Sequence, residues 1–352
     1  MKVLKFGGTS VANSKSLSKV IEILKSQSEP IVVVVSALGG ITDLLLGMLQ
    51  LALERQENFK DNLDEIEKRH LEPIKACIPI QNQSGIISFL KNHLNELESR
   101  LDAIFLLEEV TVKNNATIAS YGEILSSAII QEIFKYNGVA SVLKDARELI
   151  QTESSNNRDI VSEAVSIKKI TAYFKENQSK VVLVPGFISS NASGETTTLG
   201  RGGSDYSAAI IANALEAKVL EIWTDVSGMY TAHPKIVTQA KPIKKLSYYE
   251  AMELSHFGAK VIYPPTLQPL VEKNIPIVIK NTFAPEDEGT LIDGNASSEN
   301  GEIVKGISHI DNVALLNLEG SGMIGITGFS KRLFEALSDE DINIIMITQA
   351  SS

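Results

Sequence analysis

The sequence predicts an α/β protein, built as a three-layer α/β/α sandwich around a mainly parallel sheet. Short apolar runs alternate with longer segments of helical periodicity from the amino terminus to about residue 224. The run at residues 31–35 is entirely apolar and contains four valines, which is typical of a strand buried on both faces of a parallel sheet. Glycine-rich segments follow several of these runs, as expected where ligands bind at the carboxyl ends of parallel strands.

The order of the elements supports this fold class. Asn13 and Ser14 are good N-cap residues for the first helix, and Asn137-Gly138 is a typical helix end. Strands that alternate with helices favour parallel pairing in a layered fold. The expected elements are strands at 3–6, 31–35, 139–143, 181–184 and 219–224, helices at 17–24, 44–53, 116–134, 161–174, 206–217 and 249–254, and a charged helical insert at about 54–110.

The last fifty residues are expected to form a separate unit. Residues 284–301 are rich in Pro, Glu, Asp, Gly and Ser, and they are interpreted as a linker between a domain at 1–283 and a domain at 302–352. The second domain should contain a strand at 313–318, a helix at 328–337 and a strand at 342–348. Because the chain ends directly after an apolar strand whose partner strands are missing, we expect this domain to be cut short at residue 352.

Composition narrows the class of protein. The chain has 352 residues, 43% of them hydrophobic, and a mean hydropathy of +0.05, which is enough for a large core. A net charge of −10 disfavours nucleic acid as a partner. The single cysteine, Cys77, cannot form an internal disulfide, which favours a reducing compartment. Without a membrane-length apolar run or a leader before the first strand, we expect a soluble cytoplasmic protein that does not bind membranes.

Two glycine-rich segments carry charges suited to an anionic ligand. Residues 200–205 read Gly-Arg-Gly-Gly-Ser-Asp between an apolar strand and an apolar helix, and residues 5–8 read Lys-Phe-Gly-Gly after a strand. Glycine lets backbone N–H groups approach a ligand closely, and a helix N-terminus favours negative charge. Arg201 can bind a carboxylate or a phosphate through two hydrogen bonds, and Lys5 supplies a point charge. The second segment is not a Walker A loop, and by itself it could be an ordinary turn.

These segments resemble the aspartokinases of the amino acid kinase superfamily. Further motifs follow in that family's order. The motifs are Lys5–Ser10 with Val11-Ala12, Val35–Ala37 followed by Gly39–Thr42, Tyr121–Glu123, Gly200–Asp205, Thr224–Val226 and Phe257–Val261. The sequences of residues 249–283 and 328–352 most resemble those of aspartokinases fused to homoserine dehydrogenase. The tail, with Gly320–Gly322, resembles the first half of an ACT regulatory domain.

The resemblance implies an amino acid kinase fold and a kinase activity. The enzyme would transfer the γ-phosphoryl group of ATP to the β-carboxylate of L-aspartate, giving 4-phospho-L-aspartate, the first step towards lysine, threonine and methionine. A carboxylate is already deprotonated at neutral pH, so the site needs positioning and charge screening rather than a strong base. The resemblance also implies Mg²⁺ with ATP, a homo-oligomer, and feedback by threonine or lysine in the full-length protein. The five histidines show no ligand spacing, and we assign no protein ligand to a metal.

The resemblance also assigns roles to residues. Lys5 would neutralise the transferring phosphoryl group, and Asp205 would organise Lys5. Glu123 would hold the α-ammonium group of aspartate, Arg201 one of its carboxylates, and Thr42 would contribute a hydroxyl. Backbone N–H groups of the first four glycines would contact phosphates. The residues expected to bind ATP are Lys5, Gly7, Gly8, Ser36, Gly39, Gly40, Gly202, Gly203, Ser204, Thr224, Asp225, Tyr230, Lys235, Lys260 and Val261.

Ordinary structural roles compete with several of these assignments. Asp205 could be a helix N-cap, Glu123 a solvated helix residue, Ser36 a strand-end hydroxyl and Lys260 a surface lysine.

The chain also departs from the family at residues 233–235, which read His-Pro-Lys where Asp-Pro-Arg is usual, and lysine lacks the planar fork of arginine. Two other functions stay open. One is a related kinase acting on acetylglutamate, carbamate or UMP, and the other is a non-catalytic amino acid sensor.

Overall fold

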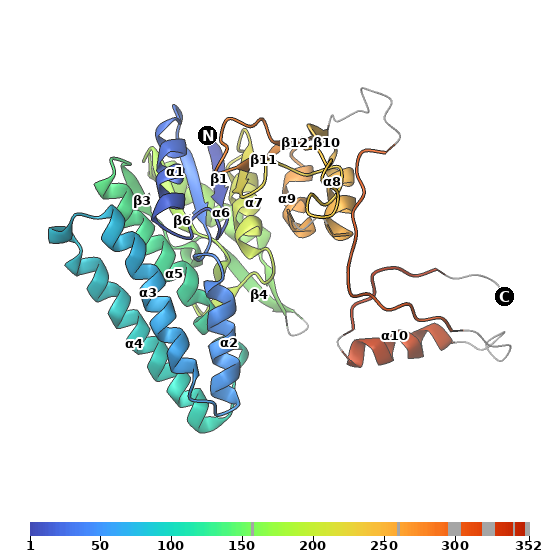
Figure 1. The fold of residues 1–352 in the computed structure, drawn as a ribbon, viewed down its shortest axis with the longest axis horizontal. Coiled ribbons are helices and arrows are strands. Elements are labelled where there is room, and N and C mark those ends of the chain that lie inside the picture. Colours follow the sequence, from blue (N-terminus) through green and yellow to red (C-terminus); the bar gives the residue numbers. More distant parts are fainter. Residues whose placement is uncertain (156–157, 259–260, 295–303, 319–327, 341, 349–352) are drawn as a thin grey trace. The chain divides into compact units, whose positions relative to one another are not determined.

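A mainly parallel sheet occupies the centre of the larger unit of the chain, residues 1–309, as seen in a computed structural model (Figure 1). The structure describes all residues except 156–157, 259–260, 295–303, 319–327, 341 and 349–352. Its main sheet has eight strands in the order β10-β12-β11-β9-β1-β2-β6-β3, and β11–β12 is its antiparallel pair. The strands of this sheet are β1 (Lys2–Phe6), β2 (Ile31–Val35), β3 (Ser141–Leu143), β6 (Val181–Pro185), β9 (Leu220–Thr224), β10 (Lys245–Leu246), β11 (Ile277–Asn281) and β12 (Thr290–Ile292).

Helices cover both faces of this sheet, so the predicted three-layer sandwich is confirmed. One face packs against α1 (Ser14–Lys25), α2 (Ile41–Leu53), α3 (Phe59–Cys77), α4 (Ser84–Leu107) and α5 (Val112–Tyr136), of which the last four form a bundle (Figure 1). The other face packs against α6 (Glu163–Glu176), α7 (Gly203–Ala214), α8 (Tyr248–His256) and α9 (Gln268–Val271).

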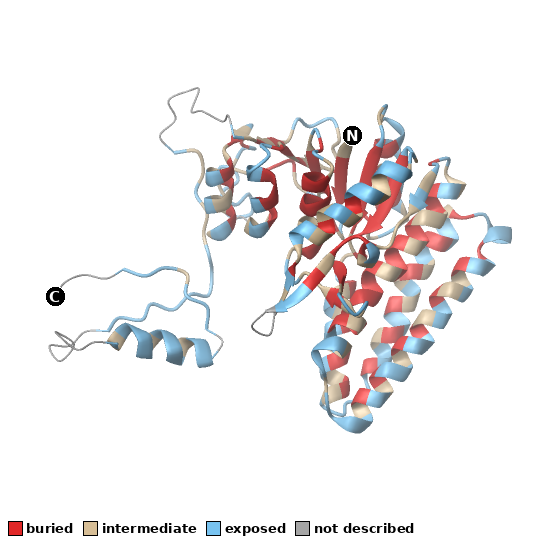
Figure 2. Ribbon diagram, turned by 180° about the vertical axis from the view of Figure 1, so that it is seen from behind, coloured by how far each residue is buried: buried red, intermediate tan, exposed pale blue. Residues whose placement is uncertain are grey.

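The central strands divide their side chains between two cores. In β2, Val33 belongs to the core beneath α1–α5, whereas Val32 and Val34 belong to the core beneath α6–α9. The same alternation in β1 places Val3 beneath α7 and Phe6 on the opposite face. All five residues of β2 are buried, as Figure 2 shows for the centre of the sheet. The fully apolar run at 31–35 is thus explained by burial on both faces.

Several boundaries differ from those expected. Asn13 is the N-cap of α1, and its side chain accepts a hydrogen bond from the Ser16 N–H, as predicted. Helix α7 begins at Gly203, three residues before the expected start, because the apolar pattern used to locate it begins only after its first turn. The segment 284–301, interpreted as a linker, contains β12 at Thr290–Ile292, which pairs with β11 and β10, so that interpretation is wrong there.

A second, four-stranded sheet was not predicted. Its order is β5-β4-β7-β8, and the strands are β4 (Gln151–Ser155), β5 (Arg158–Val161), β7 (Ile188–Asn191) and β8 (Thr196–Thr198). These strands have three to five residues, and β4, β7 and β8 consist largely of Ser, Thr and Asn. They lack the apolar runs and the alternation by which a strand is identified in sequence.

The chain divides into two compact units, Met1–His309 and Ile310–Ser352. In the second unit, the helix expected at 328–337 is present as α10 (Phe329–Asp339). The two strands expected at 313–318 and 342–348 are not formed, and that prediction is wrong for this structure. Leu315 is 94% exposed and Met346 72% exposed, so these apolar side chains gain little burial that would favour a strand. Residues 320–322 lie outside the described part of the chain.

Within the described residues, no helix combines the length and the apolar character needed to cross a membrane.

Close packing at the end of β6 gives a stability prediction. A Cβ atom on residue 186 would lie 2.6 Å from Ser204 Cβ and 2.7 Å from Ser204 Cα, so only glycine lets the first turn of α7 pack there. Gly186→Ala should therefore lower the free energy of unfolding by about 1–3 kcal/mol in urea titrations. Gly47→Ala in α2 is the matched control, because a Cβ there meets open space and helical alanine gains roughly 0.5–1 kcal/mol. Equal stability of the Gly186 variant and the wild type would contradict this packing.

Candidate functional site

Several of the predicted site residues lie at one edge of the main sheet, where its parallel strands end. Strand β1 leads into Gly7-Gly8, β2 into Ser36–Gly40, and β9 ends at Thr224, next to Asp225. Strand β6 leads into Gly186, whose N–H donates to Val35 O at 2.8 Å. The carboxyl ends of these neighbouring strands therefore form one surface, as sequence order and parallel pairing predicted.

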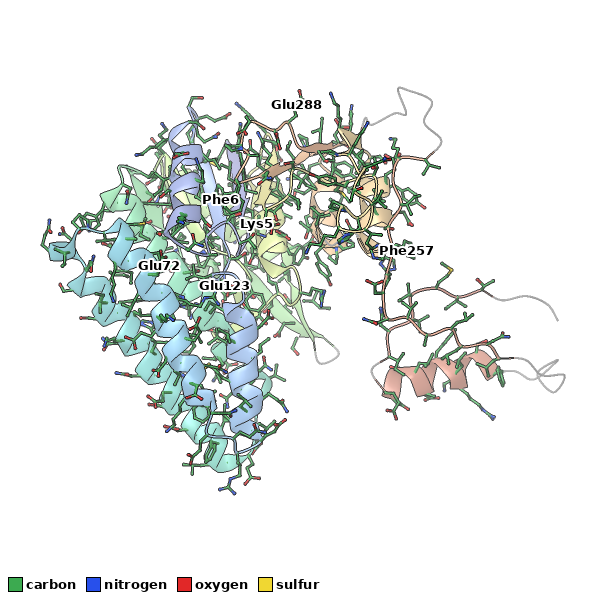
Figure 3. All side chains as sticks on the ribbon, in the orientation of Figure 1. Lys5, Phe6, Glu72, Glu123, Phe257 and Glu288 are labelled. Carbon is green, nitrogen blue, oxygen red and sulfur yellow. The ribbon has the colours of Figure 1, made fainter. Side chains whose placement is uncertain are left out.

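An ion pair joins the two glycine-rich segments. Lys5 points to the α7 face of the sheet, and its Nζ lies 2.5 Å from Asp205 Oδ1 (Lys5 is labelled in Figure 3). The two side chains are only 11% and 13% exposed, so water screens this pair weakly. Asp205 lies in the first turn of α7, where a negative charge is favoured. The N-cap is Gly202, without a side-chain cap, so Asp205 is not the capping residue that it could have been.

Two of the loop amides already have partners within the chain. The Gly7 N–H donates to Trp223 O at 3.0 Å, and the Gly39 N–H donates to Gly8 O at 3.0 Å. The prediction that these two amides are offered to phosphates is therefore corrected: they join β1 to β9 and join the two loops to each other. The Gly8 and Gly40 amides donate to no other described residue, and they keep the predicted role.

Glu123 is a buried carboxyl group behind the second loop. It comes from α5 and is 3% exposed, so it is not the solvated helix glutamate considered as an alternative (labelled in Figure 3). Its Oε1 accepts a hydrogen bond from the Ala37 N–H at 3.1 Å, whereas its buried Oε2 has no partner in the described chain. Burial raises the pKa of Glu123 to about 8, although the Ala37 N–H and Lys5 act in the opposite direction. A positively charged ligand would satisfy this carboxyl group.

The remaining residues expected to contact the substrate lie nearby, and fewer contacts hold their side chains in place. Thr42 is the second residue of α2 and is partly buried, and Ser36 is partly buried directly after β2. Arg201 is exposed in the turn before α7, and it forms no ion pair among the described residues. Gly203 and Ser204 are buried at the start of α7, packed against the end of β6.

Only some of the residues predicted to bind the nucleotide lie close together in the structure. Thr224 is partly buried, and its hydroxyl donates to the exposed Asp225 carboxylate at 3.2 Å. Tyr230 and Lys235 lie further along the connection between β9 and β10, and Lys235 is exposed. Val261 is partly buried against the core beneath α7. Lys260 lies outside the described residues.

Three features of this edge were missed. Lys280 is the fourth residue of the short apolar strand β11, and its Nζ lies 5.0 Å from the centroid of the Trp223 ring; the same signal identified Lys5 in β1. Phe187 has a φ of 64°, a strained conformation for a bulky residue, and its N–H donates to Ser207 Oγ of α7. Arg69 of α3 donates to Gly39 O. The last two depend on contacts distant in sequence, for which no local pattern exists.

No group of three or more His, Cys, Asp or Glu side chains is placed to hold a metal ion within the part of the chain that the structure describes.

Comparison with known proteins assigns most of the chain to two families. Residues 1–281 match the amino acid kinase family, and residues 316–352 match an ACT domain. A chloroplastic bifunctional aspartokinase/homoserine dehydrogenase 1 from Arabidopsis thaliana is 35% identical over 99% of this chain and 39% of its own length. Lysine-sensitive aspartokinase 3 from Escherichia coli is 33% identical over 98% of this chain and 75% of its own length.

Solved structures agree with the sequence comparison. The crystal structure of E. coli aspartokinase III in complex with aspartate and ADP matches with a TM-score of 0.82 and 30% identity, over 99% of this chain and 76% of that one. The same enzyme in complex with lysine and aspartate also matches with a TM-score of 0.82 and 30% identity, over 99% of this chain and 77% of that one. The chain spans about two fifths of the length of the curated bifunctional relatives that it matches.

The raised pKa of Glu123 gives a pH prediction. Because its folded pKa of about 8 exceeds the ordinary value of 4.5, the folded state binds the proton more tightly, and the wild type loses stability as pH rises between these values. Glu123→Gln keeps the hydrogen bond with Ala37 but cannot ionise, so it should gain stability over the wild type from about pH 5 to about pH 9. The gain should reach a few kcal/mol at about 1.4 kcal/mol per pKa unit.

Urea unfolding at a series of pH values measures this difference. The control is Glu65→Gln, the same substitution at an exposed position of α3. Parallel stability curves for the wild type and the Glu123 variant would contradict a raised pKa.

Proposed function

This chain belongs to the amino acid kinase family and, within it, to the aspartokinases, and we propose from this that the protein phosphorylates L-aspartate. A β-carboxylate oxygen of aspartate attacks the γ-phosphorus of ATP, the bond to the β-phosphate oxygen breaks, and 4-phospho-L-aspartate and ADP leave. The E. coli relative was crystallised with aspartate and ADP, which supports the substrate and the nucleotide.

The Lys5–Asp205 ion pair among the glycine loops carries the proposal. Two anions must approach each other in this reaction, and the aspartate carboxylate needs no base. Lys5 provides a fixed positive charge at the end of β1, and the Gly8 and Gly40 amides provide donors around it. Asp205 keeps the ammonium group in place through α7. Such an arrangement stabilises charge on a transferring phosphoryl group without reorganising during the reaction.

Glu123 holds the α-ammonium group of aspartate in this proposal. Its buried Oε2 has no partner within the described chain, and a ligand cation would supply one. Binding the ammonium group favours the ionised carboxylate, so substrate binding releases the proton that burial retains. Arg201 and Thr42 face the carboxylates of aspartate, and exposed Arg201 has room to move towards them.

ATP lies across the ends of β1 and β9, with Thr224, Asp225, Tyr230, Lys235, Lys260 and Val261 on the nucleotide side. Mg²⁺ accompanies ATP and is held mainly by phosphate oxygens and water, which is its usual mode in such sites. Asp205 is already paired with Lys5, and this supports a metal bound through the nucleotide rather than through a protein cluster. A cytoplasmic location is part of the proposal, supported by the single cysteine, Cys77, which cannot form an internal disulfide.

The whole protein is proposed to be longer and regulated by an end-product amino acid. Its matched relatives include aspartokinases fused to homoserine dehydrogenase, and residues 316–352 match an ACT domain. The E. coli enzyme was crystallised with lysine, so lysine or threonine is the proposed effector, and a homo-oligomer is the proposed assembly. The proposed catalytic domain extends past residue 283 to include β12, and the segment that matches an ACT domain, residues 316–352, is proposed to be regulatory.

Product trapping tests the proposed activity. Hydroxylamine converts an acyl phosphate to a hydroxamate, so hydroxamate should form only when aspartate and ATP are both present. Acetylglutamate, carbamate and UMP should support no ADP formation. ADP formation with one of these acceptors but not with aspartate would replace the proposed function by another kinase activity. No turnover of any acceptor, together with effector binding, would favour the amino acid sensor.

Lys5→Met should reduce kcat for aspartate phosphorylation by about a hundredfold or more, because it removes a charge that stabilises the transition state. It should also lower stability, since Asp205 would be left buried without a partner. The double variant Lys5→Met/Asp205→Asn removes that unpaired charge, so it should recover stability but not activity. Lys2→Met, at the other end of β1, is the matched control. Activity of the double variant close to that of the wild type would remove Lys5 from the mechanism.

A further inference from the structure

Arg69 reaches from the helical insert to the second glycine loop. It lies on α3 and is partly buried, and its Nη2 donates to Gly39 O. Its Nη1 lies 3.7 Å from the position that a Cβ on residue 40 would take. No carboxylate among the described residues forms an ion pair with Arg69. The Arg69 guanidinium group therefore binds a backbone carbonyl, and a charged donor forms a strong hydrogen bond with such an acceptor.

The carbonyl belongs to the central peptide of a tight turn. The Ile41 N–H donates to Leu38 O at 2.9 Å, which closes a four-residue turn at residues 38–41. Gly40 has φ 78° and ψ 0°, the values of the third residue of a type II turn, which glycine adopts without strain. A type I turn spans the same four residues but has its central peptide rotated by about half a turn. Because residues 39 and 40 are both glycine, side chains do little to prevent this rotation.

Arg69 contacts the group that distinguishes the two turns. In a trans peptide, the Gly39 C=O and the Gly40 N–H point in opposite directions. With Gly39 O held by Arg69, the Gly40 N–H points away from α3, at the start of α2, and it donates to no other described residue. Rotation of this peptide would replace that N–H by a carbonyl oxygen, which repels an anion.

Helix α3 is itself anchored to the segment after the first glycine loop. Glu72, one turn beyond Arg69, accepts hydrogen bonds from the Ser14 N–H at 2.9 Å and the Ser14 hydroxyl at 2.5 Å (Glu72 is labelled in Figure 3). Ser14 is the first residue of α1, which follows Gly7-Gly8. One helix of the insert therefore contacts both the second glycine loop and the start of α1, although its own sequence carries none of the family motifs.

We propose that Arg69 is a positioning residue, which keeps the Gly39–Gly40 peptide in the type II orientation so that the Gly40 N–H faces the transferring phosphoryl group. The proposal rests on the proposed aspartate kinase function for the identity of the anion. The effect of the contact between Arg69 and Gly39 on the turn does not require that function.

Arg69→Ala should lower kcat by about ten- to a hundredfold, as expected when one preorganised donor is lost. The KM for aspartate should change less than about threefold, because Glu123 and Arg201 are unchanged. Millimolar methylguanidinium should restore a substantial part of kcat by occupying the vacated position. Lys68→Ala, which removes an exposed positive charge from the preceding residue, should have wild-type kinetics with and without methylguanidinium. Thermal melting verifies that each variant is folded.

A crystal structure of the Arg69→Ala variant tests the turn without reference to activity. A central peptide rotated to type I, or present in both orientations, is expected, and a turn that stays wholly type II would overturn the proposal. A loss of kcat that methylguanidinium does not restore would overturn it as well. If Arg69→Ala does not fold, Arg69→Lys serves in its place and should retain part of kcat through a single charged donor. If the wild type fails to phosphorylate aspartate, the proposed function fails, while the turn structure still decides the role of Arg69.

Discussion

The nearly buried ion pair between Lys5 and Asp205 is the constraint on which the site depends. A lysine inside an apolar strand is costly to remove from water, and only an opposite charge at short range makes it tolerable. Asp205 reaches it because α7 packs directly against Gly186 at the end of β6, and β6 reaches β1 through β2. The parallel register of three strands and one glycine contact thus fix the distance between two charges that are 200 residues apart in sequence. The folded chain thus offsets the unfavourable desolvation of the Lys5 ammonium group before any substrate binds.

The elements that local pattern defines were predictable, and those that depend on distant contacts were not. The valine run of β2, the glycine segments after β1 and β2, and the Asn13 cap could all be recognised because neighbouring residues determine them. The polar second sheet could not, since its strands are held by pairing rather than by apolar faces. Burial of Glu123 behind the second loop depends on packing between α5 and α2, which helical periodicity does not reveal. The hydrogen bonds of the Gly7 and Gly39 N–H groups could not be predicted either, because they depend on how β1 pairs with β9 and on how the two loops contact each other.

The second unit, Ile310–Ser352, shows the same difference between elements set by local sequence and elements that need distant contacts. Its helix α10 forms because a helix satisfies its own backbone hydrogen bonds. The apolar segments on either side of it, residues 313–318 and 342–348, have strand-like sequences, yet the structure forms no strand there and most of their side chains are exposed. A strand needs a neighbouring strand for its backbone and a cover for its apolar face. A strand-like sequence therefore forms a strand only where the fold provides both.

Three peptides of the second glycine loop are held by different parts of the fold. Glu123 accepts from the Ala37 N–H, Arg69 donates to Gly39 O, and Gly8 O accepts from the Gly39 N–H. The contacts with Arg69 and Gly8 do not depend on a change of ionisation. The contact between Glu123 and Ala37 does, since an ionised carboxylate accepts a stronger hydrogen bond than a neutral carboxyl group. A ligand ammonium that ionises Glu123 would therefore also tighten its hold on Ala37. Recognition of an amino group and ordering of the second glycine loop would in this way be joined through one buried carboxyl group.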